Sequence, residues 1–94
     1  MKVVVVGAGG FIGTKLVDML TREGEEVVSA SRRSGVDVLT GAGLAHALAG
    51  ADALVDVTNA PSFDPDELAE FFGTGTTNMV AAARAAGVKH FVEL

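Results

Sequence analysis

The sequence predicts an α/β domain built on a doubly wound parallel sheet that helices cover. Three observations predict this fold. Apolar runs of strand length alternate along the chain with stretches whose apolar residues recur at helical spacing. Residues 3–6 are four consecutive valines, as is typical of a central strand buried on both faces. A glycine-rich turn at residues 7–13 then leads directly into an amphipathic helix.

The other elements continue this alternation. The helix after the glycine turn should end at Gly24. The expected strands are residues 3–6, 27–30, 36–39, 53–57 and 88–94, and a short helix is expected over residues 44–48. Joined by right-handed crossovers, these five strands predict the sheet order 3-2-1-4-5. A ligand is expected where this order reverses, between strands one and four.

A long helix is expected over residues 65–86. Its boundary signals are Asp64 or Ser62 at the start and Gly87 at the end. Gly73 and Gly75 lie inside it, and each weakens a helix by about 1 kcal/mol relative to Ala. We therefore expect the helix to be kinked or broken at these glycines.

Composition narrows the classes of protein. Ninety-four residues suit one small domain, and 49% hydrophobic with 20% charged residues indicates a soluble globular chain. No apolar run approaches the roughly 20 residues of a membrane span. The absence of Cys, and an apolar start too short for a signal peptide, predict a cytoplasmic protein. A net charge of −5 argues against nucleic acid as a partner, and neither His46 nor His90 has the neighbours of a metal site.

The glycine turn is the motif with the clearest chemistry. Gly7, Gly10 and Gly13 follow a strand and open a helix in the register GxxGxxG. A GxGxxG pattern that starts at Gly7 and Gly9 would need glycine at position 12, which is Ile12. Gly7 permits the tight turn, Gly10 lets the backbone approach a pyrophosphate, and Gly13 lets the helix pack near the sheet. The N-terminus of the helix then offers N–H groups to an anion. This context predicts a Rossmann-type dinucleotide-binding domain rather than a mere tight connection.

The end of the second strand indicates which cofactor binds. NAD-selective domains usually place Asp or Glu there, but this chain has Ser31, Arg32 and Arg33, and the next acid is Asp37. A guanidinium group matches the 2′-phosphate of NADP, and Ser31 can donate a hydrogen bond to it. Two solvated charges in a turn are the alternative. We favour NADP over NAD.

Two polar residues near the fourth strand are ambiguous. Asn59 contacts the adenine-side ribose or is an ordinary turn residue, and the sequence leaves both readings open. Asp56 interrupts an apolar strand, and a carboxylate there is more often hydrogen-bonded and structural than catalytic. We therefore assign no catalytic residue and no metal ligand.

The chain also resembles a known family. VVVVGAGGFIGTKLV, ASRRS, LAGADALVDVTNAPSF and GTTNMVAAARAAGVKHFVEL together resemble atypical short-chain dehydrogenases, and among them the NmrA-like, NAD(P)H-binding branch. The resemblance spans the whole chain, which we take as one N-terminal NAD(P)-binding domain, residues 1–94. It implies cofactor contacts from three groups of residues: Gly7, Gly9, Gly10, Phe11, Ile12 and Gly13 at the pyrophosphate; Ser31, Arg32 and Arg33 at the adenosine phosphate; and Thr58, Asn59 and Ala60 at the adenine and ribose.

Two departures from the family limit what the resemblance implies. Relatives continue past the fifth strand, whereas this chain stops at Leu94, so we expect an incomplete domain that self-associates through its exposed last strand or is marginally stable. The Tyr-x-x-x-Lys pair cannot exist here because there is no tyrosine. The chain is therefore the cofactor-binding part of an NADP-dependent oxidoreductase, a non-catalytic NADP-binding redox sensor, or a fragment of a sugar-nucleotide epimerase.

Overall fold

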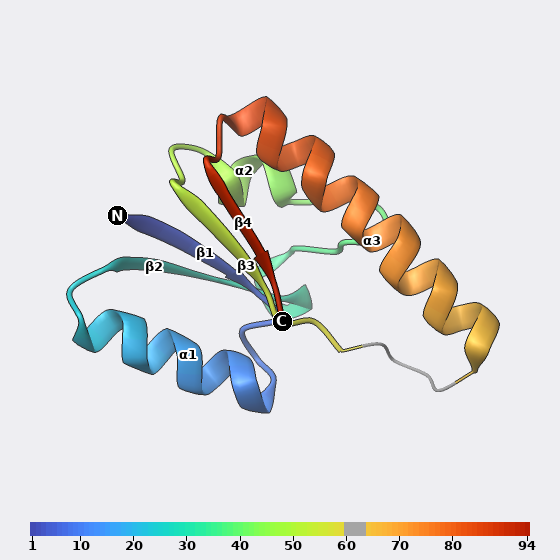
Figure 1. The fold of residues 1–94 in the computed structure, drawn as a ribbon, viewed down its shortest axis with the longest axis horizontal. Helices are drawn as coiled ribbons and strands as arrows, with labels where there is room; N and C mark the ends of the chain where they lie inside the picture. The colour runs from blue at the N-terminus through green and yellow to red at the C-terminus, as the bar shows by residue number, and fades with distance from the viewer. Residues whose placement is uncertain (60–63) are drawn as a thin grey trace.

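The computed structural model describes residues 1–59 and 64–94, which form an α/β domain around a parallel sheet (Figure 1). In chain order the elements are β1 (Lys2–Val6), α1 (Phe11–Arg22), β2 (Glu26–Ala30), a short 3-10 turn η1 (Arg32–Ser34), α2 (Leu44–Leu48), β3 (Ala53–Asp56), α3 (Pro65–Ala86) and β4 (His90–Glu93). Within the described residues the sheet has four strands in the order β2-β1-β3-β4, all parallel. The predicted α/β class and the reversal beside the first strand are confirmed.

The valine run of β1 lies at the centre of the sheet and separates two hydrophobic clusters. Val3 and Val5 face α1, while Val4 and Val6 face the side that α2 and α3 cover. Successive side chains of a strand point to opposite faces, and helices cover both faces here, so Val4 and Val5 are both fully buried. A run of β-branched residues without polar alternation is therefore what a central strand covered on both sides requires.

The strand expected at residues 36–39 does not form, so that part of the prediction is wrong. The segment makes one isolated antiparallel bridge, between Asp37 and Ala42, instead of extending the sheet beyond β2. Its amides are used locally: Val36 N–H donates to the Ser31 carbonyl at 3.0 Å, and Leu39 N–H donates to Asp37 Oδ1 at 2.9 Å. Because glycines with positive φ follow it at 41 and 43, the chain folds back on itself rather than running beside β2.

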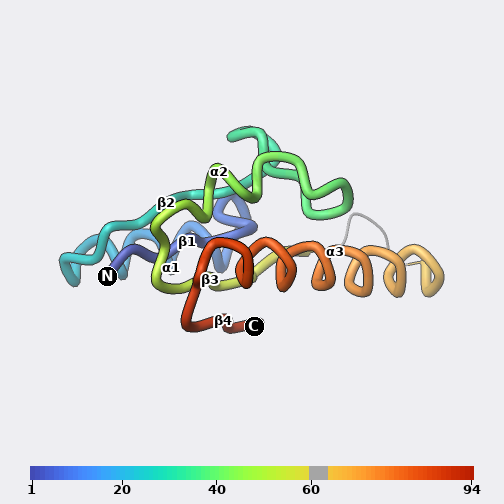
Figure 2. The backbone as a smooth tube through the Cα atoms, turned by 90° about the horizontal axis from the view of Figure 1, so that it is seen from above, coloured from blue at the N-terminus to red at the C-terminus, as the bar shows by residue number. Residues whose placement is uncertain are grey.

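The long helix α3 runs as predicted from Pro65 to Ala86, without the expected break. Asp64 caps it by accepting N–H bonds from Asp66 and Glu67, at 3.0 and 3.1 Å, and Gly87 ends it in the left-handed conformation. Figures 1 and 2 show that its N-terminal turns project beyond the strands. No helix in residues 1–59 and 64–94 is long and apolar enough to cross a bilayer.

Strand β4 forms one edge of the sheet. Val92 is 45% exposed and Leu94 is 75% exposed. An uncovered strand edge can pair with another chain, and this is the feature on which the expected self-association depends. Self-association stays a prediction.

Candidate functional site

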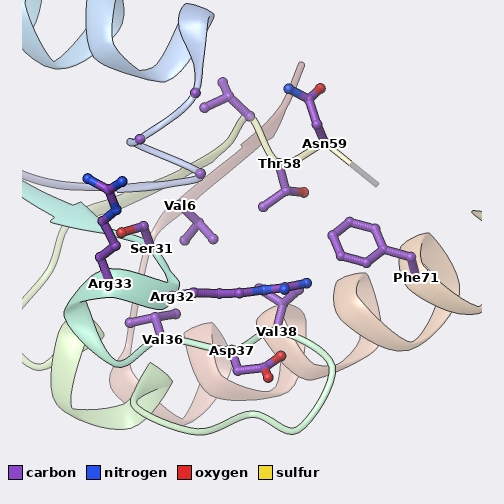
Figure 3. Close-up of a pocket in the computed structure, with 14 residues that line it drawn as sticks. Val6, Ser31, Arg32, Arg33, Val36, Asp37, Val38, Thr58, Asn59 and Phe71 are labelled. Atoms are coloured by element: carbon purple, nitrogen blue, oxygen red, sulfur yellow. The ribbon is translucent and has the colours of Figure 1, made fainter. Parts of the chain in front are cut away.

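A cavity of about 360 Å³ opens at the carboxyl ends of β1, β2 and β3, beside the point where the strand order reverses (Figure 3). Eight residues that the sequence singled out line it: Gly7, Gly9, Gly10, Ser31, Arg32, Arg33, Thr58 and Asn59. Six more lining residues were not expected there: Val6, Val36, Asp37, Val38, Val57 and Phe71. Three loops far apart in sequence therefore meet where an open α/β sheet places its ligands.

Three described residues of the predicted site do not line the cavity. Phe11 and Ile12 begin α1 and are exposed, 76% and 59%, while Gly13 is buried under the turn. Ala60 lies outside the described residues. Any contact from Phe11 or Ile12 to a ligand in the cavity would therefore come from their backbone N–H groups, not from their side chains.

Two glycines of the turn are required by the fold itself. Gly7 has φ of +88°, and a Cβ there would lie 2.8 Å from the Thr58 nitrogen. A Cβ on Gly13 would collide with the turn, at 2.8 Å from the Ala8 Cα and closer still to the Gly7 carbonyl. These two positions hold the strand, the turn and α1 against one another, whether or not a ligand binds.

Gly9 and Gly10 differ, because the fold does not require glycine at either position. Neither has a positive φ; a Cβ on Gly9 would meet nothing within 4 Å, and a Cβ on Gly10 would lie at ordinary contact distance, 3.5 Å from the Gly7 carbonyl oxygen. Both line the cavity. A pyrophosphate must approach the backbone closely, and the absence of side chains at these two positions leaves room for it. The turn therefore fits such a group.

The start of α1 is open to an anion. Its N-cap, Gly10, carries no side chain to cap the helix, and no acidic residue lies in the first turn. Thr14 stiffens the turn by donating its hydroxyl to the Gly10 carbonyl at 2.8 Å and to the Ala8 carbonyl at 3.2 Å. The first N–H groups of α1, next to the cavity-lining Gly10, and the positive end of the helix dipole can thus favour an anion at the turn.

The arginine turn closes the opposite side of the cavity. Ser34 Oγ accepts the Ser31 N–H and donates to the Ser31 carbonyl, both at 2.9 Å, and this fixes the tight turn η1. Arg32 and Arg33 are exposed, and within the part of the chain that the structure describes neither forms an ion pair. Figure 3 shows Arg33 directed toward the glycine turn and Arg32 extended across the cavity toward the side of Phe71.

The unexpected wall of the cavity comes from residues 36–38 and from α3. Val36 and Val38 face the core and the cavity together, whereas Asp37 between them is half-buried. The apolar–polar–apolar alternation that favoured a strand here serves instead to turn Val36 and Val38 toward the core. Phe71, buried on α3, closes this side and packs edge-on against Phe72 with ring centroids 5.3 Å apart.

Asp56 has a structural role at the end of β3, as the sequence suggested. Its buried carboxylate accepts the Thr58 N–H at 3.0 Å and the Thr58 hydroxyl at 2.7 Å, which orients the residue that follows β3 into the cavity. Burial raises the pKa of this carboxyl above its ordinary value of 3.8, and the Thr58 hydrogen bonds offset part of that rise. Glu93, its register partner on β4, raises the pKa further through its charge.

Comparisons with known proteins agree with this geometry. The family model for the NAD dependent epimerase/dehydratase family matches residues 3–94. A short-chain dehydrogenase/reductase superfamily protein from Agrobacterium tumefaciens, solved with bound NAD, is 28% identical with a TM-score of 0.82 over 99% of this chain and 32% of its own. MoeE5, solved with UDP-glucuronic acid and NAD, is 27% identical with a TM-score of 0.80, over 99% of this chain and 36% of its own.

One further structure supports the fold alone. UDP-glucose 4-epimerase from Thermus thermophilus, solved with NAD, is 24% identical with a TM-score of 0.84, over 97% of this chain and 36% of its own. No curated protein matches the chain. The chain thus spans about a third of the length of these solved structures.

These matches confirm the predicted similarity to short-chain dehydrogenases at the level of the broad group, whereas the NmrA-like branch stays a prediction. Fold, strand order and family model point the same way over nearly every residue. The chain belongs to the NAD dependent epimerase/dehydratase family.

Proposed function

We propose that this cavity binds a nicotinamide dinucleotide. The pyrophosphate would lie on the glycine turn at the start of α1, and the adenosine would lie between η1 and residues 36–38. The observation that carries the proposal is the pair Gly9 and Gly10, which line the cavity without side chains although the fold does not require glycine there. Two of the similar structures were solved with NAD at 27–28% identity, which supports the same class of ligand.

We further propose a preference for NADP over NAD. Arg32 and Arg33 line the adenosine side of the cavity, and neither forms an ion pair within the described residues. A phosphate beside either guanidinium group would gain charge-assisted hydrogen bonds. Asp37, the acid closest in sequence, lies beyond η1 rather than at the end of β2, and its Oδ1 accepts the Leu39 N–H. The two similar structures were solved with NAD, so a preference for NADP would distinguish this chain from them.

The reaction class follows from the cofactor. When bound, the nicotinamide would supply hydride transfer, and the residues of this chain would bind and orient it. The first candidate is therefore the cofactor-binding part of an NAD(P)-dependent enzyme of the short-chain dehydrogenase type, with sugar-nucleotide epimerases in the same family. The second candidate is an NADP-binding regulator of the NmrA-like type. It rests on the resemblance of residues 3–17 and 30–34 to the NmrA-like branch. Steady-state oxidation of NADPH with candidate carbonyl substrates, measured on the native protein that carries this domain, separates the two.

Titration with NADPH and NADH tests the binding proposal. We expect saturable binding, with NADPH tighter. The double variant Arg32→Ala/Arg33→Ala should weaken NADPH roughly tenfold or more, because charged hydrogen bonds are lost, and change NADH by less than about twofold. Arg84→Ala is the matched control, since Arg84 is an exposed arginine on α3 that does not line this cavity. Equal binding of the two cofactors, unchanged in the double variant, would refute the preference; no binding of either would refute the function.

A further inference from the structure

In the part of the chain that the structure describes, the cavity wall at residues 36–38 pairs with no strand of the sheet. Its N–H groups bond within its own loop: Val36 N–H to the Ser31 carbonyl, Asp37 N–H to the Ala42 carbonyl and Leu39 N–H to the Asp37 side chain. These bonds fix the shape of the loop. They do not fix its distance from the rest of the domain, which decides how wide the cavity is.

Beside the packing of Val36 and Val38 in the core, Asn78 on α3 supplies a polar connection between this loop and the helix. Its side-chain amide donates to the Val38 carbonyl at 2.7 Å and to the Leu39 carbonyl at 3.1 Å, across 40 and 39 residues of sequence. Both bonds are partly buried. One amide group therefore ties two consecutive carbonyls of the loop to the helix.

Gly75 lies three residues earlier, on the same side of α3. It is buried, and a Cβ there would lie 3.1 Å from the Val38 Cγ2. The helix backbone thus packs directly against the Val38 side chain, and Val38 in turn is 6% exposed and lines the cavity. Gly75 sets how closely the helix approaches, and Asn78 locks the loop at that distance.

We infer that Asn78 is a positioning residue for adenine. It does not line the cavity itself; it acts through the two carbonyls, holding Asp37 and Val38 where they form the wall against which the base would rest. This inference depends on the proposed function, because it assigns a role within the same site. It predicts that adenine recognition and pyrophosphate recognition can be separated by mutation.

The test compares ADP with inorganic pyrophosphate, each titrated against the protein. Asn78→Asp keeps the size of the side chain but replaces the donor with a carboxylate that repels both carbonyls. We expect it to raise the Kd of ADP roughly tenfold, the effect of leaving partly buried polar groups unpaired, and to leave the Kd of pyrophosphate within about twofold. Asn78→Ala, which removes the donor and favours the helix, should raise the ADP Kd by roughly threefold to fivefold and provides the test if the Asp variant does not fold.

Thr77→Ala is the matched control, because Thr77 is exposed and, within the described residues, its hydroxyl bonds back to the Gly73 carbonyl of the same helix. A wild-type protein that binds neither ADP nor pyrophosphate overturns the proposed function. A wild type that binds ADP, with both Asn78 variants unchanged, overturns the positioning role alone. Equal weakening of ADP and pyrophosphate also overturns it, since that result reports a general loss of structure.

Discussion

The cavity has two walls that are built in different ways. The glycine turn is a local structure: within seven residues a strand ends, the backbone turns at a glycine with φ of +88°, and α1 begins. The loop after β2 is shaped by its own hydrogen bonds but is placed by Asn78, about 40 residues further along the chain. The difference teaches that one wall of the site is encoded by neighbours in sequence, and the other only by the assembled fold.

A substitution at Gly7 should produce the largest effect, because it breaks the local wall. Gly7→Ala would force an L-residue into the left-handed region and push its Cβ to 2.8 Å from the Thr58 nitrogen. We expect the free energy of unfolding to fall by roughly 3 kcal/mol, from backbone strain and overpacking together. Urea denaturation measures it. Gly73→Ala is the control, since a Cβ there meets nothing within 4 Å and alanine favours the helix; an equal loss at both glycines would contradict the steric argument.

Gly10→Ala separates binding from folding within the same wall. A Cβ there makes only ordinary contacts with the protein, so the unfolding free energy should fall by about 1 kcal/mol or less, the cost of a poorer N-cap. Dinucleotide affinity should fall roughly tenfold or more, because the methyl group takes the space that the pyrophosphate would use. Isothermal titration and urea denaturation on the same sample give both numbers. Unchanged affinity would show that Gly10 does not face the ligand.

Asp56 provides a smaller effect, seen in how stability depends on pH. Its pKa is raised in the folded protein, mainly by burial, so the folded state holds this proton more tightly than the unfolded state. Its contribution is therefore most favourable below pH 3.8 and is lost as the pH rises from there through the raised pKa. Asp56→Asn retains an oxygen that can accept both Thr58 bonds but cannot titrate, so it should remove this part of the pH dependence.

Denaturation at a series of pH values from about 3 to 7 measures that difference. Asp64→Asn is not a suitable control, because Asp64 caps α3. Asp52→Asn is the better control, since Asp52 is exposed and the Asn amide oxygen can still accept the Lys2 N–H. An identical pH profile for the wild type and Asp56→Asn would contradict the assignment of the raised pKa to Asp56.

Local signals made much of the fold predictable. The valine run, the glycine spacing and the boundaries of α3 each rest on residues within one turn or strand of one another, and the elements they indicated were found. The strand predicted over residues 36–39 does not form, because valines that alternate around Asp37 suit a strand and a core-facing loop equally well. What decided between them was the fold-back at Gly41 and Gly43, together with the packing of α3.

The candidate site shows the same division. The lining residues from the glycine and arginine turns were predictable, because they end strands that point to one edge of the sheet. Phe71 and Val38 were not assigned to the site, because the packing of α3 against the loop after β2 brings them to the cavity only in the assembled fold. Gly75, expected to weaken the helix, instead allows it to approach Val38 closely.

The most direct test of the central claim is to map the backbone amide signals of the protein by NMR as NADPH is added. The account predicts saturable changes that cluster at residues 7–13, at 31–38 and at 57–59, the three loops that meet at the cavity. Changes confined to other surfaces, or no saturable change, would contradict it.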